Sequence, residues 1–294
     1  MGLGIDAGGT RTRWALAGGA GEIVAEGEAR GMSALQVGQG DHVRDALEEI
    51  AGAVAPHGHP VRVHAGMTGF GENIEALRGL VAAALGIDAS RVTLASDMEI
   101  AYLDLFAPGE GYMVYAGTGS VAAFIDADGT LHRAGGRGVV VDDGGSGFWI
   151  AREALRRVWR LEDEKPGSWR ASPMAAALFR AIGGSEWAST REYIYGRDRG
   201  AVGRLALAVA GTADEDPTAR EILCAAGAEL ARLASAMTQR YGPRPVALSG
   251  RVVDLHPLIA GTMRSTLPGG FPLALRPARG QCAAARIALS RAIE

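Results

Sequence analysis

The chain has 294 residues, 48% of them hydrophobic and 21% charged, and a formal net charge of −3 at pH 7. These values are typical of a soluble globular protein long enough for two domains, and they exclude the strongly basic surface that binds nucleic acid. Lys165 is the only lysine, so the chain contains neither a Walker-A phosphate loop nor the strand lysine of a protein kinase.

The first hundred residues predict a three-stranded antiparallel meander followed by two helix–strand crossovers. Glycine-bearing turns separate the first short apolar runs, and apolar residues at helical spacing follow Asp41, the expected cap of the first helix. This order, βββαβαβα, differs from the strict strand–helix alternation of a Rossmann domain. The predicted strands cover 2–6, 12–17, 23–29, 61–65 and 92–96, and the predicted helices cover 41–55, 72–85 and 98–106.

The same plan recurs after a break at Ala107-Pro108-Gly109, with extra helices inserted. The predicted strands cover 112–116, 120–126, 130–135, 246–249 and 273–276. The predicted helices cover 146–160, a pair within 172–195, 201–210, 218–240, 256–266 and 281–292. A repeat on this scale predicts two similar α/β domains, 1–107 and 108–280, with a cleft between them. The last segment, 281–294, is expected to pack back on the first domain.

The first hairpin combines an acid, two glycines and a threonine. Asp6 ends an apolar strand, and the turn contains Gly8, Gly9 and Thr10, followed by Arg11. Glycines let backbone N–H groups approach a phosphate, and a carboxylate is a ligand that Mg²⁺ prefers, here through water. An ordinary glycine-rich hairpin would explain this motif if it stood alone.

A second glycine–threonine hairpin lies at the equivalent place of the second repeat. An apolar strand is followed by Gly117, Thr118, Gly119 and Ser120. The two loops therefore predict a polyphosphate-binding site with one loop on each side. The spacing also fits the dinucleotide fingerprint G-x-G-x-x-A. That fingerprint requires a helix after the loop, whereas 120–126 continues as a strand, so the Rossmann interpretation fails.

Three further segments carry polar groups. Asp97 follows a buried strand, where an acid can orient a substrate hydroxyl and accept its proton, although it could also be a plain helix cap. The glycine-rich loop with Gly136 and Arg137 leads to Asp142 and Asp143 before a helix. These acids could bind sugar hydroxyls or an ammonium group, or could complement the helix dipole. The last of these three segments, Ser249-Gly250-Arg251, is a small-residue turn on which a base or ribose could lie.

Together these motifs resemble the sugar kinase, heat-shock 70 and actin superfamily. Asp143-Gly144-Gly145-Ser146-Gly147-Phe148-Trp149-Ile150 and Ser96-Asp97 narrow the resemblance to the branch of N-acetylglucosamine kinase, bacterial glucosamine kinase and the BadF/BadG/BcrA/BcrD-type ATPases. The resemblance implies two ribonuclease-H-like (actin-like ATPase) domains closing on Mg-ATP and a sugar. It implies ATP and Mg²⁺ as cofactors, an amino sugar as the substrate, and a homodimer.

The resemblance also assigns roles to residues. Asp97 would be the general base that takes the proton from the 6-hydroxyl, and Asp6 would bind Mg²⁺ through water. The nucleotide side would comprise Asp6, Gly8, Gly9, Thr10, Arg11, Gly117, Thr118, Gly119, Ser120, Gly250 and Arg251. The sugar side would comprise Ser33, Thr68, Gly69, Asp97, Thr118, Gly136, Arg137, Asp142 and Asp143.

The chain departs from the family pattern at the sugar side, so the acceptor stays open. Leu35 stands near the place of a sugar-binding asparagine of N-acetylglucosamine kinases, and Gly144 stands where they carry a glutamate. The Gly-Gly-Arg sequence is closer to glucosamine kinase. Free glucosamine and N-acetylglucosamine both remain candidates.

Two alternatives belong to other functional classes. One is a BadF-type ATPase without sugar kinase activity, which would need cysteines for an iron–sulfur cluster. Cys224 and Cys282 lie instead in helix-like stretches and are expected to be buried thiols. The other is a non-catalytic sugar-sensing regulator, which would add a helix-turn-helix and a zinc-binding cysteine cluster. We expect no signal peptide and no membrane span, and therefore a cytoplasmic protein.

Overall fold

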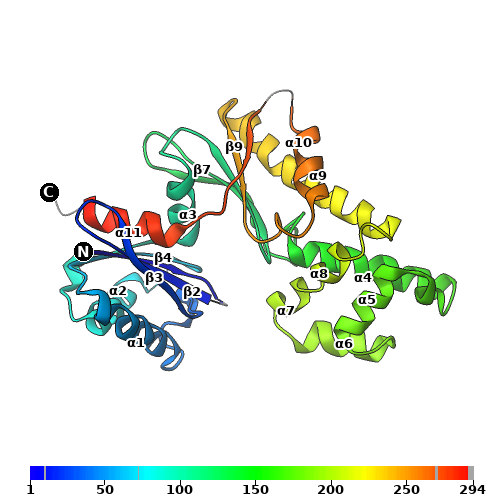
Figure 1. Ribbon diagram of the computed structural model, residues 1–294, viewed down its shortest axis with the longest axis horizontal. Coiled ribbons are helices and arrows are strands. Elements are labelled where there is room, and N and C mark those ends of the chain that lie inside the picture. Colours follow the sequence, from blue (N-terminus) through cyan, green and yellow to red (C-terminus); the bar gives the residue numbers. More distant parts are fainter. Residues whose placement is uncertain (10, 72, 269–270, 291–294) are drawn as a thin grey trace. The chain divides into compact units, whose positions relative to one another are not determined.

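The structure is a computed structural model that describes residues 1–9, 11–71, 73–268 and 271–290. The chain divides into two compact units (Figure 1). Unit 1 comprises Met1–Ala107 and Ala278–Glu294, and unit 2 comprises Pro108–Pro277. The return to unit 1 thus begins at Ala278, slightly before the boundary that the sequence predicts. None of the helices in the described part of the chain has the length and apolarity that crossing a bilayer would require.

Unit 1 is built on a five-stranded mixed sheet in the order β3-β2-β1-β4-β5. The first three strands form the antiparallel meander, and β4 and β5 add to β1 in parallel. The strands are β1 (Gly2–Ala7), β2 (Arg11–Ala17), β3 (Ile23–Arg30), β4 (Arg62–Met67) and β5 (Val92–Ser96). Because β1, β4 and β5 are parallel, their carboxyl ends meet at one edge of the sheet.

Helices cover both faces of this sheet (Figure 1). Side chains alternate between the faces of a strand, so Leu3, Ile5 and Ala7 of β1 join the apolar core under α1 and α2. The opposite face packs against α3 and α11. The helices are α1 (His42–Val54), α2 (Ile74–Leu85), α3 (Asp97–Leu105) and α11 (Gly280–Ser290), with short 3-10 turns η1 (Ala34–Gln36), η2 (Ala55–His57) and η3 (Ala89–Arg91). Asp41 precedes α1 as expected, but its side chain makes no capping hydrogen bond and instead pairs with Arg44 at 3.5 Å.

The last helix packs tightly on the first strand. A Cβ added at Gly4 would lie 2.0 Å from the carbonyl oxygen of Gln281 and 2.2 Å from the backbone nitrogen of Ala285. Backbone cannot yield as a flexible side chain can, so only glycine allows α11 to approach β1 this closely. The first and last segments of the chain therefore form one core.

Unit 2 repeats the sheet plan of unit 1. Its strands lie in the order β10-β9-β6-β7-β8, with β6, β7 and β8 antiparallel and β9 and β10 parallel to β6. The strands are β6 (Tyr112–Ala116), β7 (Ser120–Ile125), β8 (Leu131–Gly135), β9 (Val246–Ser249) and β10 (Leu273–Leu275). The internal repeat read from the sequence therefore corresponds to two sheets of the same topology.

Unit 2 carries the additional helices. The long α9 packs against β6, β7 and β8 and against α10. The helices are α4 (Gly147–Glu164), α5 (Pro173–Ile182), α6 (Trp187–Gly196), α7 (Arg199–Gly203), α8 (Ala206–Ala210), α9 (Pro217–Tyr241) and α10 (Pro257–Thr266), with the 3-10 turn η4 (Ser168–Ala171). The single helix expected over 201–210 is two short helices, and the first of them ends at Gly203, a residue of low helix propensity.

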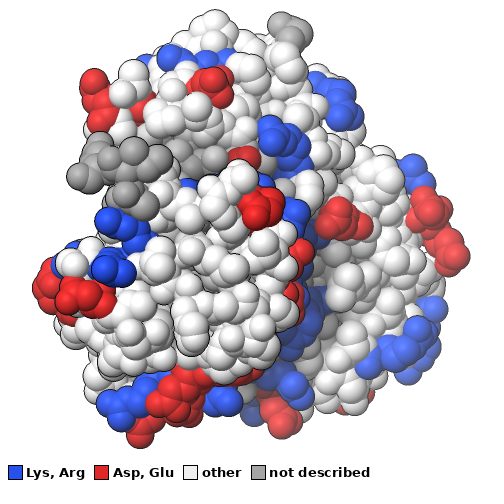
Figure 2. All heavy atoms as spheres, turned by 60° about the vertical axis from the view of Figure 1, so that its left-hand side comes forward, with Lys and Arg blue, Asp and Glu red and all other residues white. Residues whose placement is uncertain are grey.

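The surface carries both signs of charge. On the face shown in Figure 2, basic and acidic side chains intermingle rather than gathering into a patch of one sign. This distribution agrees with the net charge of −3 and offers no basic stripe for nucleic acid on that face.

Candidate functional site

The acids of unit 1 lie at the carboxyl edge of its sheet. Asp6 is near the end of β1, and Asp97 is the first residue of α3, directly after β5. Burial raises the pKa of Asp6 to about 6, while the Arg13 charge opposes this rise and the nearby negative charge of Asp97 adds to it. The two carboxylates predicted from separate motifs therefore interact within one unit.

Asp97 is held in a fixed orientation. Thr68 donates its hydroxyl to Asp97 Oδ2 at 2.5 Å, and the backbone N–H of Met98 donates to Oδ1 at 2.9 Å. The capping role belongs to Ser96, whose hydroxyl accepts the N–H of Glu99 at 3.2 Å. Asp97 is therefore not the cap of α3, and its oriented carboxylate retains capacity to accept a further proton donor.

The loop after β3 is fastened to the same edge. Ser33 donates its hydroxyl to the carbonyl of Thr68 at 3.0 Å, and the N–H of Ala34 donates to that carbonyl at 3.0 Å. Gly69 is exposed beside Thr68. The structure thus brings together four of the predicted sugar-side residues, Ser33, Thr68, Gly69 and Asp97.

In the first hairpin the two glycines differ in their contacts, and so do the two arginines of β2. The N–H of Gly8 donates to the carbonyl of Arg11 at 3.1 Å, while Gly9 is exposed. Thr10 lies outside the described residues. Arg11 forms an ion pair with Glu28 at 2.8 Å, whereas Arg13 lies 3.4 Å from Asp6 Oδ2. The sequence singled out Arg11 and missed Arg13, whose position two residues later on the same face of β2 would have been the signal.

The second hairpin is joined to the start of α4. The N–H of Gly147 donates to the carbonyl of Gly117 at 2.8 Å, and that of Phe148 donates to the carbonyl of Thr118 at 3.3 Å. Gly119 leaves room for the Asp143 carboxylate, since a Cβ there would lie 2.5 Å from Asp143 Oδ2. Ser120 is buried and donates to the carbonyl of Gly144 at 2.7 Å, so its hydroxyl serves the loop.

A cavity of about 520 Å³ opens beside this hairpin, wholly within unit 2. Its residues come from the second hairpin, the start of α4, the α7–α8 segment and the turn after β9. They are Gly117, Thr118, Gly147, Gly200, Gly203, Arg204, Leu207, Ala210, Gly211, Arg251, Val252, Asp254 and Leu255. The α7–α8 wall, including Leu207, was not predicted, because only the fold brings it opposite the hairpin. The volume lies in the range of small-molecule sites.

The turn after β9 requires glycine. Gly250 has φ +96°, and a Cβ there would lie 2.3 Å from the carbonyl oxygen of Ala116. The N–H of Val252 donates to the same carbonyl at 3.1 Å. Gly250 therefore lets the turn pack closely against the end of β6. The next residue, Arg251, lines the cavity.

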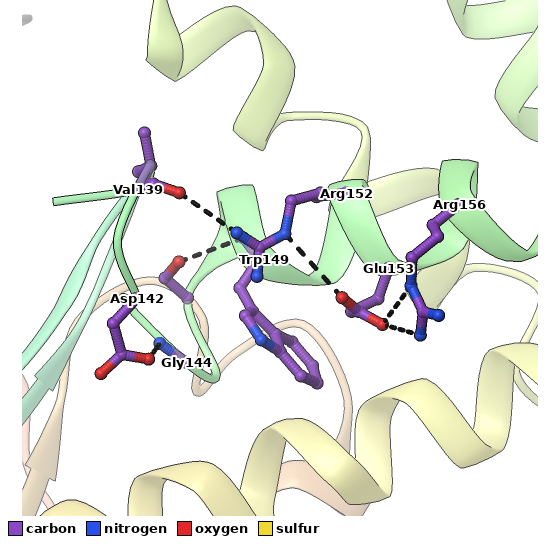
Figure 3. A network of polar contacts seen from close by, with 8 residues as sticks. Val139, Asp142, Gly144, Trp149, Arg152, Glu153 and Arg156 are labelled. Carbon is purple, nitrogen blue, oxygen red and sulfur yellow. Dashed lines mark hydrogen bonds and ion pairs between the residues drawn. The ribbon is translucent and has the colours of Figure 1, made fainter.

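The loop between β8 and α4 is a dense polar network (Figure 3). Asp143 is buried at φ +55° and accepts the N–H of Gly138 at 3.1 Å, and its burial raises the pKa of its carboxyl. Asp142 accepts the N–H of Gly144 at 3.2 Å and pairs with Arg232 at 3.2 Å. Arg152 of α4 donates to the carbonyl of Val139 at 3.2 Å. These bonds hold the loop against the start of α4 and against α9, while Gly136, Arg137, Val140 and Val141 are exposed.

The predicted residues thus form two clusters, one in each unit. Unit 1 contains Asp6, Gly8, Gly9, Arg11, Ser33, Thr68, Gly69 and Asp97, and unit 2 contains Gly117, Thr118, Gly119, Ser120, Gly136, Arg137, Asp142, Asp143, Gly250 and Arg251. Within unit 2 the cavity gathers Gly117, Thr118 and Arg251 but not Asp142 or Asp143.

The comparison with family models gives one match. The model of the BadF/BadG/BcrA/BcrD ATPase family matches residues 3–263. No curated protein matches the sequence.

Solved structures give similarities over the whole chain. A candidate N-acetylglucosamine kinase from Chromobacterium violaceum is 26% identical, with a TM-score of 0.73 and 98% of each chain covered. Another, from Porphyromonas gingivalis, is 19% identical, with a TM-score of 0.77, 98% of this chain covered and 99% of that one. A ROK family glucokinase from Streptomyces griseus, solved with glucose and AMPPNP, is 18% identical, with a TM-score of 0.63, 99% of this chain covered and 98% of that one. These similarities and the two five-stranded sheets confirm the predicted fold class, α/β with two actin-like ATPase units.

Proposed function

Because this chain belongs to the BadF/BadG/BcrA/BcrD ATPase family, we propose that it transfers the γ-phosphoryl group of ATP to the 6-hydroxyl of an amino sugar. Glucosamine and N-acetylglucosamine are the two candidate acceptors. The similarity to the Chromobacterium violaceum protein and to the ROK glucokinase supports a sugar kinase. The observation that carries the proposal is the oriented Asp97 carboxylate beside Thr68.

Asp97 is suited to the acceptor side of the reaction. Thr68 and the Met98 N–H fix the carboxylate, which leaves acceptor capacity for a sugar hydroxyl. As the hydroxyl oxygen attacks phosphorus, its proton passes to Asp97, and the bond from phosphorus to the leaving oxygen of ADP breaks. Ser33, whose hydroxyl is bonded to the Thr68 carbonyl, and the exposed Gly69 would flank the sugar.

The unit 2 cavity is suited to the nucleoside. Its volume of about 520 Å³ exceeds what a base and ribose need, and its wall combines glycine backbone with apolar Leu207, Val252 and Leu255. Thr118 adds a hydroxyl, and Arg204 and Arg251 add positive charge. An adenine ring would lie on the apolar wall while the phosphates face the Gly117–Gly119 hairpin.

The donor set of unit 1 fits a magnesium ion. Asp6 is a carboxylate of which 17% of the side chain is exposed, and Asp97 adds negative potential nearby. No group of three or more His, Cys, Asp or Glu side chains in the described ranges could hold a metal by itself. Mg²⁺ usually binds through one or two carboxylates, water and substrate phosphates, so this arrangement suits it. A bound Mg²⁺ would supply charge neutralisation on the phosphates, and Asp6 would hold it through water.

The iron–sulfur alternative has little support in the cysteines. Cys282 packs in the core between β2 and α11 of unit 1, where burial raises the pKa of its thiol, and Cys224 lies in α9 of unit 2. A buried thiol of raised pKa is a poor cluster ligand. The observations therefore favour an amino-sugar kinase over a cluster-bearing ATPase.

An ADP-release screen tests the proposal. The purified protein, Mg²⁺ and ATP are combined with glucose, glucosamine, N-acetylglucosamine, N-acetylmannosamine or a muramic sugar, and ADP is measured. We expect release that depends on an amino sugar, with phosphorus NMR placing the phosphate on C6. Hydrolysis without sugar dependence would identify an ATPase instead, and sugar binding without turnover would identify a regulator.

A further inference from the structure

An exposed leucine lies beside the segment that orients the acid of unit 1. Leu35 is the middle residue of the 3-10 turn η1, and 64% of it is exposed. A Cβ added at Gly69 would lie 2.6 Å from Leu35 Cγ, so the leucine side chain covers the backbone of Gly69. Gly69 follows Thr68, whose hydroxyl orients Asp97. Leu35 is therefore an apolar neighbour of the residues that we propose for the sugar.

The turn that carries Leu35 is held by its own polar side chains. The Ser33 hydroxyl accepts the N–H of Leu35 at 3.3 Å and donates to the Thr68 carbonyl at 3.0 Å. Gln36 Oε1 accepts the N–H of Ser33 at 2.9 Å, which completes a capping box. Gln39 Nε2 donates to the Leu35 carbonyl at 2.9 Å. The backbone of Leu35 is thus fixed, while the outer surface of its side chain stays open to a ligand.

The position of Leu35 separates it from the other large exposed hydrophobic residues of unit 1. In the described part of that unit these are Met1, Val24 and Val61. Met1 and Val61 directly precede the parallel strands β1 and β4, and Val24 is the second residue of the antiparallel β3, so all three lie at the amino edge. Leu35 follows the end of β3 and lies at the carboxyl edge with Asp97. A lone exposed leucine needs no explanation, but this one accompanies the acid.

An apolar side chain at this edge selects among amino sugars by the substituent on nitrogen. Apart from the nitrogen on C2, a hexosamine carries hydroxyl groups. An N-acetyl group ends in a methyl, whereas a free amine is charged when protonated. The methyl gains from contact with a leucine, but an ammonium group loses water there without gaining an acceptor. We propose that Leu35 contacts the acyl methyl group and makes an N-acylated amino sugar the preferred acceptor over the free amine. This inference rests on the proposed function.

The ratio of kcat/KM for N-acetylglucosamine to that for glucosamine tests this role. A ratio taken within one variant cancels differences in the active fraction of the protein. We expect the wild type to favour N-acetylglucosamine and Leu35→Ala to reduce the ratio about 3- to 10-fold, the loss of a partly exposed apolar contact. The loss should lie mainly in KM, because the contact is the same before and during phosphoryl transfer. Leu35→Met, which keeps the apolar surface, should restore the ratio.

A change in the acyl group tests the contact from the side of the substrate. N-formylglucosamine and N-acetylglucosamine share a neutral amide and differ by the methyl carbon. With the wild type, kcat/KM should rise about 2- to 4-fold from formyl to acetyl. With Leu35→Ala this rise should disappear, because two groups in contact show coupled effects.

Val24→Asn is the matched control. Val24 is 44% exposed at the amino edge of the same sheet, so this variant should keep the wild-type ratio. Equal losses for both sugars in Leu35→Ala would indicate contact with the sugar ring or a general effect on the turn, and would overturn the assignment. A wild type that prefers glucosamine would also overturn it, although the proposed function would stand because an amino sugar is still phosphorylated. ADP release that depends on no amino sugar would overturn the proposed function and this inference together.

Discussion

Replacing Asp6 by asparagine tests whether ionisation of the buried Asp6 carboxyl lowers the stability of unit 1. The pKa of Asp6 rises from its ordinary value of 3.8 to about 6, mainly through burial. A folded-state pKa above the unfolded one means that the native state binds the proton more tightly, so wild-type stability falls as pH rises between these values. A shift of roughly two pKa units corresponds to about 3 kcal/mol.

Asparagine does not titrate, so the stability of Asp6→Asn lacks the pH dependence that ionisation of Asp6 gives the wild type. The free energy of unfolding of the variant minus that of the wild type should rise by about 2.4 kcal/mol between pH 4 and pH 7 and stay level above pH 7. Loss of the partly exposed Asp6–Arg13 pair adds an offset of about 0–1 kcal/mol that lowers the difference at neutral pH.

Hydrogen exchange of the β1 and β2 amides is the suitable assay, because it reports the opening free energy of unit 1 apart from that of unit 2. Mg²⁺ and nucleotide are left out, since both would bind near Asp6. A stability difference that does not change with pH would refute the claim that burial governs the ionisation of Asp6.

Three further substitutions probe unit 2. Gly250→Ala should lower the melting temperature and weaken Mg-ADP binding, because the added Cβ meets the Ala116 carbonyl at 2.3 Å and φ is +96°; unchanged melting and binding would contradict that close approach. Leu207→Asp should weaken binding of adenosine by about 10-fold, because a charge replaces part of the apolar cavity wall; unaltered adenosine affinity would remove Leu207 from the site. Lys165→Ala should keep the kcat and KM of the wild type, because Lys165 ends α4 outside the residues that line the cavity; a large loss of kcat would show that the lysine takes part.

The sequence predicts the strands and their repeat well, because alternation and glycine turns are local signals. The α/β class and the order of the strands in both halves agree with the structure. The hairpin at Gly117 and the acid Asp97 are also visible in sequence, since each motif lies within a few consecutive residues.

Features that depend on contacts between distant segments are not predictable in this way. The ion pair of Arg11 with Glu28 of β3 joins residues 17 positions apart, and no motif in the sequence indicates it. Leu207 lines the cavity only because α7 and α8 fold against the second hairpin. Asp142 resembles a ligand residue in sequence, yet Arg232 from α9 binds it.

Single-turnover phosphotransfer by Asp97→Asn tests the central claim most directly. The variant keeps the shape of the side chain and can still accept the Thr68 hydroxyl, but its amide is a far weaker base. We predict that it binds Mg-AMPPNP with wild-type affinity while the transfer of phosphate from ATP to the preferred amino sugar slows by about 100-fold or more, the usual contribution of general base catalysis. Transfer at a rate close to that of the wild type would contradict the role of Asp97 and the mechanism built on it.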